Sequence, residues 1–111
     1  VAGIIDPGAT PSEVAKREAR EEANIDIPTP VHIATVYSSP GGYGERTHMY
    51  LGCTDLSKAG GLHGLAHEHE DIRAVVVPLA EALAAAFDGR LRDAKTILMV
   101  QWLSANKAQF I

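Results

Sequence analysis

Glu18, Glu21 and Glu22 have the side chains and the spacing to hold a divalent metal ion. In a helix, residues four apart share a face, so the carboxylates of Glu18 and Glu22 would point the same way, with Glu21 on the flank. At about 100° per residue, the same face carries the apolar residues Val14, Ala15, Ala19 and Ala23. Half-buried like charges repel and are poorly solvated, so they require a cation, and oxygen ligands suit Mg²⁺ or Mn²⁺. This segment therefore predicts a metal site.

A second interpretation of the same residues stays open. Arg17 and Arg20 stand among the glutamates, and a run of both charges is most often a salt-bridged, solvated helix face. Helix geometry alone does not separate this interpretation from the metal site.

The helix that would present these glutamates has its own start and stop signals. Thr10 is a typical N-cap residue, Pro11 suits the first helical position because its missing N–H is no loss there, and Glu13 completes a capping box. Asn24 stands where a left-handed C-terminal residue is expected. These signals predict a helix from Pro11 to Ala23.

The stretch resembles the Nudix box, G-x5-E-x7-R-E-U-x-E-E-x-G-U, in which U is aliphatic. Gly3, the run from Arg17 to Glu22, and Ile25 are in register with it. Ala9 stands where the box has its first Glu, and Asn24 stands where it has Gly. In the family that first Glu helps to hold the loop and the box arginine. Its replacement therefore bears on the rigidity of the site more than on the metal ligands.

The rest of the chain is similar to one branch of this family, the bacterial ADP-ribose pyrophosphatases. The shared segments are Ser39-Pro40-Gly41-Gly42, Glu45-Arg46, Gly61 to Ala66, Glu70 to Arg73 and Gln101 to Leu103. The resemblance implies a Nudix fold, with a mixed β-sheet between helices, and hydrolysis of ADP-ribose to AMP and ribose 5-phosphate with Mg²⁺, or with Mn²⁺ in its place. It also implies a homodimer whose sites are built from both chains.

The resemblance assigns metal-binding roles to several residues. Glu18 and Glu22 would bridge metal ions, and Glu21 would be a further ligand or an orienting group. The backbone carbonyl of Ala2 and the carboxylate of Glu70 would complete the ligand shells.

The remaining roles implied by the resemblance concern catalysis and substrate. Arg17 would pair with the box carboxylates and hold them in place, and Glu68 would be the general base on a loop that closes over the substrate. Substrate contacts would fall on Ser39, Gly41, Gly42 and Ile4. Without the resemblance, the loop after Ser39 is a plain hairpin turn, and Glu68 and Glu70 form a solvated acidic turn.

Two other functions stay open. The S-P-G-G segment also occurs in related nucleotide-sugar hydrolases, so GDP-mannose or ADP-glucose could be the substrate. Ala9 is the feature that favours a Nudix-fold ligand-binding module without catalysis. The intact Glu18, Glu21 and Glu22 oppose that interpretation, because a module that only binds ligand needs no three helical carboxylates.

Length and charge narrow the class of protein. The chain has 111 residues, which fits a single α/β (α+β) domain, and the resemblance implies a partial Nudix domain over 1–111. The net charge of −4 disfavours nucleic-acid binding. A single Cys53 excludes an internal disulfide, which favours a reducing compartment such as the cytoplasm. No apolar run is long enough to span a membrane. The start at Val1 in an apparent strand suggests that further strands precede the box.

Hydrophobic patterning predicts the remaining elements. Strands are expected at Val1–Ile5, Val31–Tyr37, Glu45 to about Thr54, and Ile72–Val77. Helices are expected from Pro78 to about Phe87 and from about Asp93 to Lys107. Between the strand that ends near Thr54 and the strand that begins at Ile72, residues Asp55 to Glu70 are expected to form a long loop. Loops of this length are often functional. Three histidines, His63, His67 and His69, lie in its second half. Their spacing matches no common zinc motif.

Overall fold

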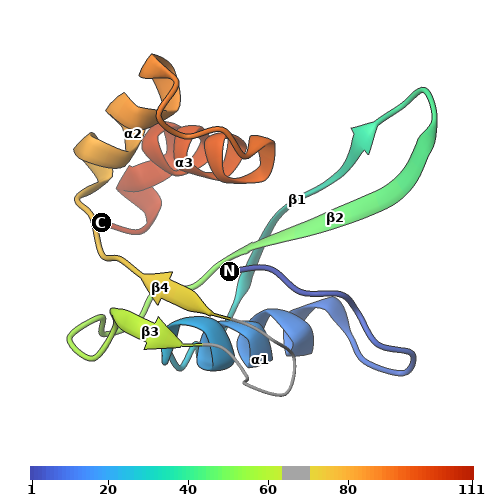
Figure 1. The fold of residues 1–111 in the computed structure, drawn as a ribbon, viewed down its shortest axis with the longest axis horizontal. Coiled ribbons are helices and arrows are strands. Elements are labelled where there is room, and N and C mark those ends of the chain that lie inside the picture. Colours follow the sequence, from blue (N-terminus) through green and yellow to red (C-terminus); the bar gives the residue numbers. More distant parts are fainter. Residues whose placement is uncertain (64–70) are drawn as a thin grey trace. The chain divides into compact units, whose positions relative to one another are not determined.

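The computed structural model describes residues 1–63 and 71–111 and divides into two compact units, Val1–Val75 and Val76–Ile111. The first unit holds α1 (Pro11–Ala23), β1 (Val31–Ser39), β2 (Tyr43–Leu51), β3 (Gly61–His63) and β4 (Ile72–Ala74). The second holds α2 (Leu79–Asp88), α3 (Ala94–Asn106) and a short 3-10 helix, η2 (Lys107–Gln109). Figure 1 shows the elements in chain order. The mixture of helices and strands agrees with the predicted α+β class.

The predicted bounds and caps of α1 are confirmed. The Thr10 hydroxyl accepts a hydrogen bond from the Glu13 N–H, and the Glu13 carboxylate accepts one from the Thr10 N–H. Asn24 has the left-handed dihedral angles φ 55° and ψ 42°. Because each cap satisfies backbone groups that the helix leaves unpaired, these few residues fix both ends.

The core of the first unit lies beneath α1. Val14, Ala19 and Ala23 of α1 are buried, and so is Met49 of β2. The helix contacts β2, β3 and β4, and Figure 1 shows it running beside the short strands.

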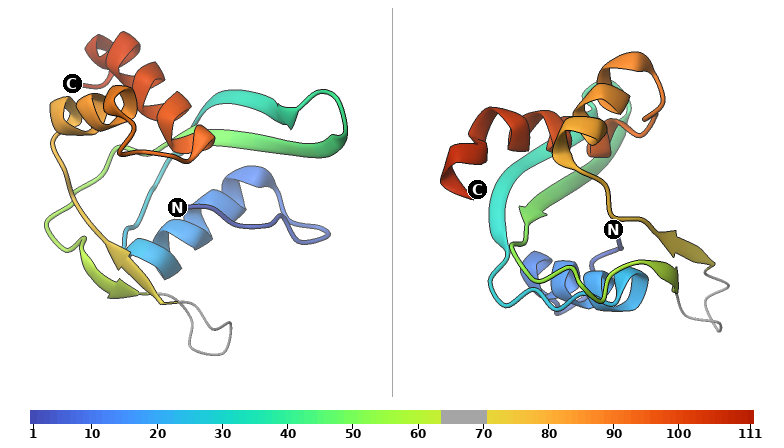
Figure 2. Two further views of the ribbon diagram at one scale, coloured as in Figure 1. Left: turned by 45° about the horizontal axis from the view of Figure 1, so that its top comes forward. Right: turned by 90° about the vertical axis from the view of Figure 1, so that its left-hand side faces the viewer.

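β1 and β2 form a long antiparallel hairpin, clearest in the left-hand view of Figure 2. Its register pairs Tyr37 with Arg46 and Ser39 with Tyr43, so the loop is confined to residues 40–42. The predicted hairpin is confirmed, although β2 begins at Tyr43, earlier than expected, and ends at Leu51.

The predicted single mixed sheet is not formed by the described residues. They form two separate antiparallel pairs, β1 with β2 and β3 with β4. Both pairs join consecutive strands, and antiparallel pairing needs only a turn or loop, whereas a parallel pair needs a crossover connection.

Two expectations about the segments before and after residues 64–70 were wrong. Gly61–His63, expected to be loop, is β3, and β4 ends at Ala74 instead of Val77. Both differences arise because β3 and β4 pair over only three residues each, and the outermost pair joins Gly61 to Ala74. Beyond it, residues 75–77 are exposed.

The expectation of a buried strand at Val1–Ile5 was also wrong. The segment has no regular secondary structure, and Ile4 is 86% exposed. No described strand pairs with it, and a strand needs a neighbour to satisfy its backbone groups.

In the second unit, α2 and α3 pack against each other. α2 is followed by the C-cap Gly89, whose φ is 90°, and α3 begins after the N-cap Asp93. The spacing of Leu79, Leu83 and Phe87 puts them on one face of α2, but only Leu79 and Leu83 are half-buried, while Phe87 is 73% exposed. Trp102 packs against Phe110, with ring centroids 5.9 Å apart.

No helix among the described residues is long and apolar enough to cross a membrane.

Candidate active site

Among the described residues of the first unit, Glu18 is the charged side chain that is buried. It is 8% exposed and lies on the same face of α1 as the buried Val14 and Ala19. A carboxylate is rarely buried without a partner, because removal from water disfavours the charged form. This burial favours the metal-site interpretation of the helix over a fully solvated charged face.

The N-terminal segment passes directly over the glutamates of α1. The backbone N–H of Ala2 donates a hydrogen bond to Oε2 of Glu22 at 3.3 Å. At Gly3, an added Cβ would collide with the carboxylate of Glu18. Glycine therefore suits the close approach of backbone and carboxylate here. Ala2 reaches the helix through its backbone N–H.

Burial and a neighbouring carboxyl group both disfavour the charged form of Glu22. Burial raises the pKa of Glu22, the hydrogen bond from the Ala2 N–H opposes that shift, and a hydrogen bond with the Glu18 carboxyl raises the pKa again. Two carboxyl groups that share a hydrogen bond cannot both be charged without cost. A proton or a cation between them relieves that cost.

Arg17 joins the site to the turn before the helix. Its Nη2 lies 3.3 Å from Oε1 of Glu18, and its Nη1 lies 2.7 Å from Oδ2 of Asp6. These hydrogen bonds, with Asp6 as the larger cause, raise the pKa of Arg17. The pairing of Arg17 with a box carboxylate was expected, but the contact with Asp6 was not. Its sequence signal is the Asp6-Pro7-Gly8 turn just before the helix.

The donor set fits a hard cation but is incomplete among the described residues. Glu18 and Glu22 face each other, and Glu21 is half-buried next to them in sequence. Within residues 1–63 and 71–111, no three His, Cys, Asp or Glu side chains gather closely enough to hold a metal. Carboxylate oxygens are the ligands that Mg²⁺ and Mn²⁺ prefer.

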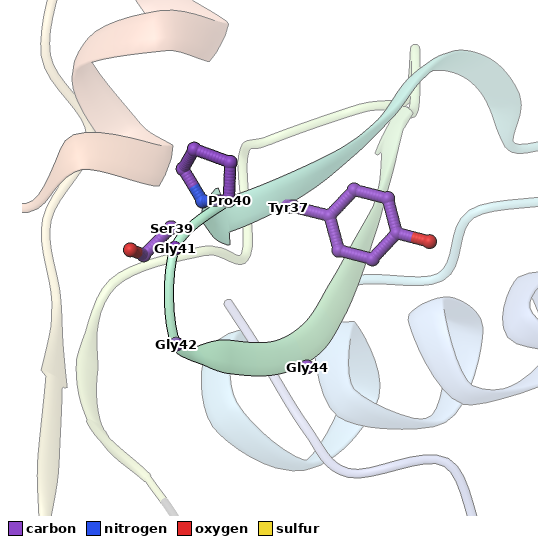
Figure 3. A pocket seen from close by; sticks show the side chains of 6 residues that line it. All are labelled: Tyr37, Ser39, Pro40, Gly41, Gly42 and Gly44. Carbon is purple, nitrogen blue, oxygen red and sulfur yellow. The ribbon is translucent and has the colours of Figure 1, made fainter.

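A separate hollow lies at the tip of the β1–β2 hairpin (Figure 3). Its volume is about 450 Å³, and it is lined by Tyr37, Ser39, Pro40, Gly41, Gly42 and Gly44. Three of the expected substrate contacts, Ser39, Gly41 and Gly42, are thus brought together, and Tyr37 is a lining residue that the sequence reasoning missed. The lining includes no residue of α1 and not Ile4.

The remaining expected site residues cannot be placed in the same way. Glu68 and Glu70 lie outside the described residues, as do His67 and His69 of the histidine cluster.

Comparisons with known proteins point to one family. Residues 1–103 match the NUDIX domain family. An ADP-ribose pyrophosphatase of Haemophilus influenzae is 39% identical over 109 residues, which cover 98% of this chain and 50% of that protein. One of Escherichia coli is 39% identical over 103 residues, covering 93% and 49%. A GDP-mannose pyrophosphatase of Pectobacterium atrosepticum is 36% identical over 104 residues, covering 90% and 51%.

The chain thus spans about half the length of these curated relatives. The domain match includes Glu18 and Glu22. The two ADP-ribose pyrophosphatases align along 93% or more of the chain. This chain therefore belongs to the Nudix family.

Proposed function

We propose that the protein hydrolyses the pyrophosphate of ADP-ribose to AMP and ribose 5-phosphate with the help of Mg²⁺, for which Mn²⁺ can substitute. The observation that carries this proposal is the buried Glu18 facing Glu22 beneath the close approach of Gly3. Such a pair of carboxylates holds excess negative charge that a divalent cation would balance. The names of the relatives supply the substrate class.

In this proposal, Glu18 and Glu22 hold the cation, with the carbonyl of Ala2, Glu21 and Glu70 as further ligands. Arg17 keeps the Glu18 carboxylate in one orientation through its hydrogen bond. A bound cation supplies charge neutralisation of the diphosphate and activation of the attacking water. Ser39, Gly41, Gly42 and Ile4 are proposed to contact the substrate, the first three through the hollow at the hairpin tip.

Glu68 is proposed as the general base that takes a proton from the attacking water. Glu68→Gln should lower the turnover rate, while the Mg²⁺ affinity measured without substrate should stay close to that of the wild type. A large loss of Mg²⁺ affinity would make Glu68 a ligand instead of the base.

The substrate is best tested by a panel. ADP-ribose, ADP-glucose and GDP-mannose should be offered to the full-length protein with Mg²⁺, and the nucleoside monophosphate products should be separated and measured. The highest kcat/KM is expected for ADP-ribose. A higher value for GDP-mannose would favour the alternative that the relative from Pectobacterium atrosepticum supports.

A separate binding measurement tests whether the protein is a catalyst at all. A calorimetric titration that shows ADP-ribose bound, without turnover in saturating Mg²⁺, would favour the non-catalytic binding module, for which Ala9 is the motivating residue.

The protein is also proposed to be a homodimer. This is tested by sedimentation equilibrium, and a monomer at micromolar concentration would contradict it.

A further inference from the structure

The turn before α1 carries a carboxylate at Asp6, its first residue, and none at Ala9, its last. The N–H of Ala9 donates to the carbonyl of Asp6 at 3.0 Å, which closes a tight turn. Pro7 suits the second position of that turn, and Gly8, with φ 86°, takes the third position, which requires a left-handed residue. Ala9 carries no polar side chain, but Asp6, at the opposite end of the same turn, carries a carboxylate.

Asp6, Arg17 and Glu18 form a chain of contacts from solvent to the buried site. Asp6 lies 2.7 Å from one terminal nitrogen of Arg17, and Glu18 lies 3.3 Å from the other. The exposed fraction of the side chain falls along this chain, from 61% for Asp6 to 40% for Arg17 and 11% for Glu18. Because the guanidinium group is planar and rigid, fixing one of its nitrogens also fixes the direction of the other.

We propose that Asp6 is a positioning residue for the metal site: it holds the Arg17 guanidinium so that Arg17 orients the Glu18 carboxylate. The inference rests on the proposed function, because it gives Glu18 the part of a metal ligand. Asp6 touches neither metal nor substrate in this scheme and acts through Arg17.

A second ion pair on the same helix provides a matched control. Arg20 lies 2.7 Å from Asp26, the same distance as between Arg17 and Asp6, and its side chain is 59% exposed. Asp26→Asn therefore removes an equivalent surface charge and weakens an equivalent charged hydrogen bond to α1, but away from Glu18. Any general effect of charge or of helix stability should appear in both variants.

The experiment compares Asp6→Asn with Asp26→Asn in the full-length protein. Mn²⁺ affinity is measured without substrate, from the free-ion electron paramagnetic resonance signal, and kcat and KM for ADP-ribose are measured separately. We expect Asp6→Asn to weaken Mn²⁺ binding by about tenfold, which is typical of groups that orient a metal ligand. At subsaturating Mg²⁺, kcat should fall with it while KM changes little. Asp26→Asn should match the wild type.

Moving the carboxylate back to the other end of the turn sharpens the test. Ala9→Glu in the Asp6→Asn background should recover most of the lost Mn²⁺ affinity. In the wild-type background the same substitution should change it little, because Arg17 is already held. Ala9→Glu in the wild-type background tests the inference even if Asp6→Asn does not fold.

The outcomes separate the inference from the proposed function. Equal Mn²⁺ affinities of Asp6→Asn and Asp26→Asn, no recovery with Ala9→Glu, or a large gain from Ala9→Glu in the wild type would each overturn the inference while activity on ADP-ribose stands. A loss and recovery of Mn²⁺ affinity in a protein that hydrolyses no nucleotide sugar would support the inference and overturn the proposed function. Absence of any Mn²⁺ binding would overturn both.

Discussion

α1 and α3 both have 13 residues and both begin after a residue whose side chain caps the helix. They differ in which residues are buried. α1 is the more polar helix, and it buries Glu18 together with Val14, Ala19 and Ala23. α3 is mostly apolar, and none of its residues is buried in the described structure, with Leu98 40% exposed.

This comparison shows that burial is not set by the apolar content of a helix. It is set by the segments that cover the helix, and α1 is covered by the N-terminal segment and by its contacts with β2, β3 and β4. A carboxylate that is buried in this way needs a compensating partner, because removal from water disfavours its charged form.

The largest expected effect is on Glu22, the half-buried carboxylate next to the buried Glu18 on one face of α1. Glu22→Gln should lower turnover by about 10²-fold or more, because it removes one charge that balances the cation, and the unfolding temperature should not fall. The control is Glu81→Gln in the exposed first turn of α2, which should leave turnover unchanged. Near-normal activity of Glu22→Gln would remove the functional meaning of the buried charge.

The cores of the two units should differ in their response to truncation. Met49 is 3% exposed, so Met49→Ala should lower the free energy of unfolding by about 3 kcal/mol. Phe87 is 73% exposed, and Phe87→Ala should change it by less than about 0.5 kcal/mol. Both are measured by urea denaturation. Equal losses would mean that Phe87 is covered in solution.

Two glycines of the first unit separate metal binding from stability. Gly3→Ala places a methyl group against the end of the flexible Glu18 side chain, which can move away, so the cost should fall on Mn²⁺ affinity, by about tenfold, and little on the unfolding temperature. Gly44→Ala meets nothing within 4 Å and should change neither. A stability loss without loss of Mn²⁺ affinity would make Gly3 a packing residue only.

The smallest expected effect concerns the cap of α3. Asp93 accepts hydrogen bonds from Lys95 and Thr96, which lower its pKa to about 2. Asp93→Ala should cost about 1 kcal/mol at neutral pH, as for other N-caps, and Asp93→Asn, which can still cap, should cost less. Because the folded-state pKa is lowered, the benefit of the ionised carboxylate is present above about pH 4 and is lost as the pH falls towards 2.

This pH dependence is measured by thermal unfolding of the wild type and Asp93→Ala between pH 2 and 7. The difference between them should shrink at the acid end. A constant difference would show that the charge of Asp93 contributes nothing to the cap.

Local chemistry explains which features could be predicted from the sequence. The bounds of α1, the capping pair Thr10 and Glu13, and the left-handed Asn24 all depend on residues within one turn of each helix end. The shared face of Glu18 and Glu22 follows from helical periodicity alone. The hairpin around the Pro-Gly-Gly segment depends on adjacent residues as well. In each case the interacting groups are close along the chain, so the sequence by itself determined them.

Only the tertiary structure decided which groups meet across longer separations. The N–H of Ala2 reaches Glu22, Gly3 lies against Glu18, and Asp6 instead of Ala9 holds Arg17. The strand partners were decided in the same way, with Gly61–His63 pairing with Ile72–Ala74 and leaving Val1–Ile5 unpaired among the described residues. Such contacts depend on how separate segments pack in three dimensions, and many packings are compatible with one local pattern of residues.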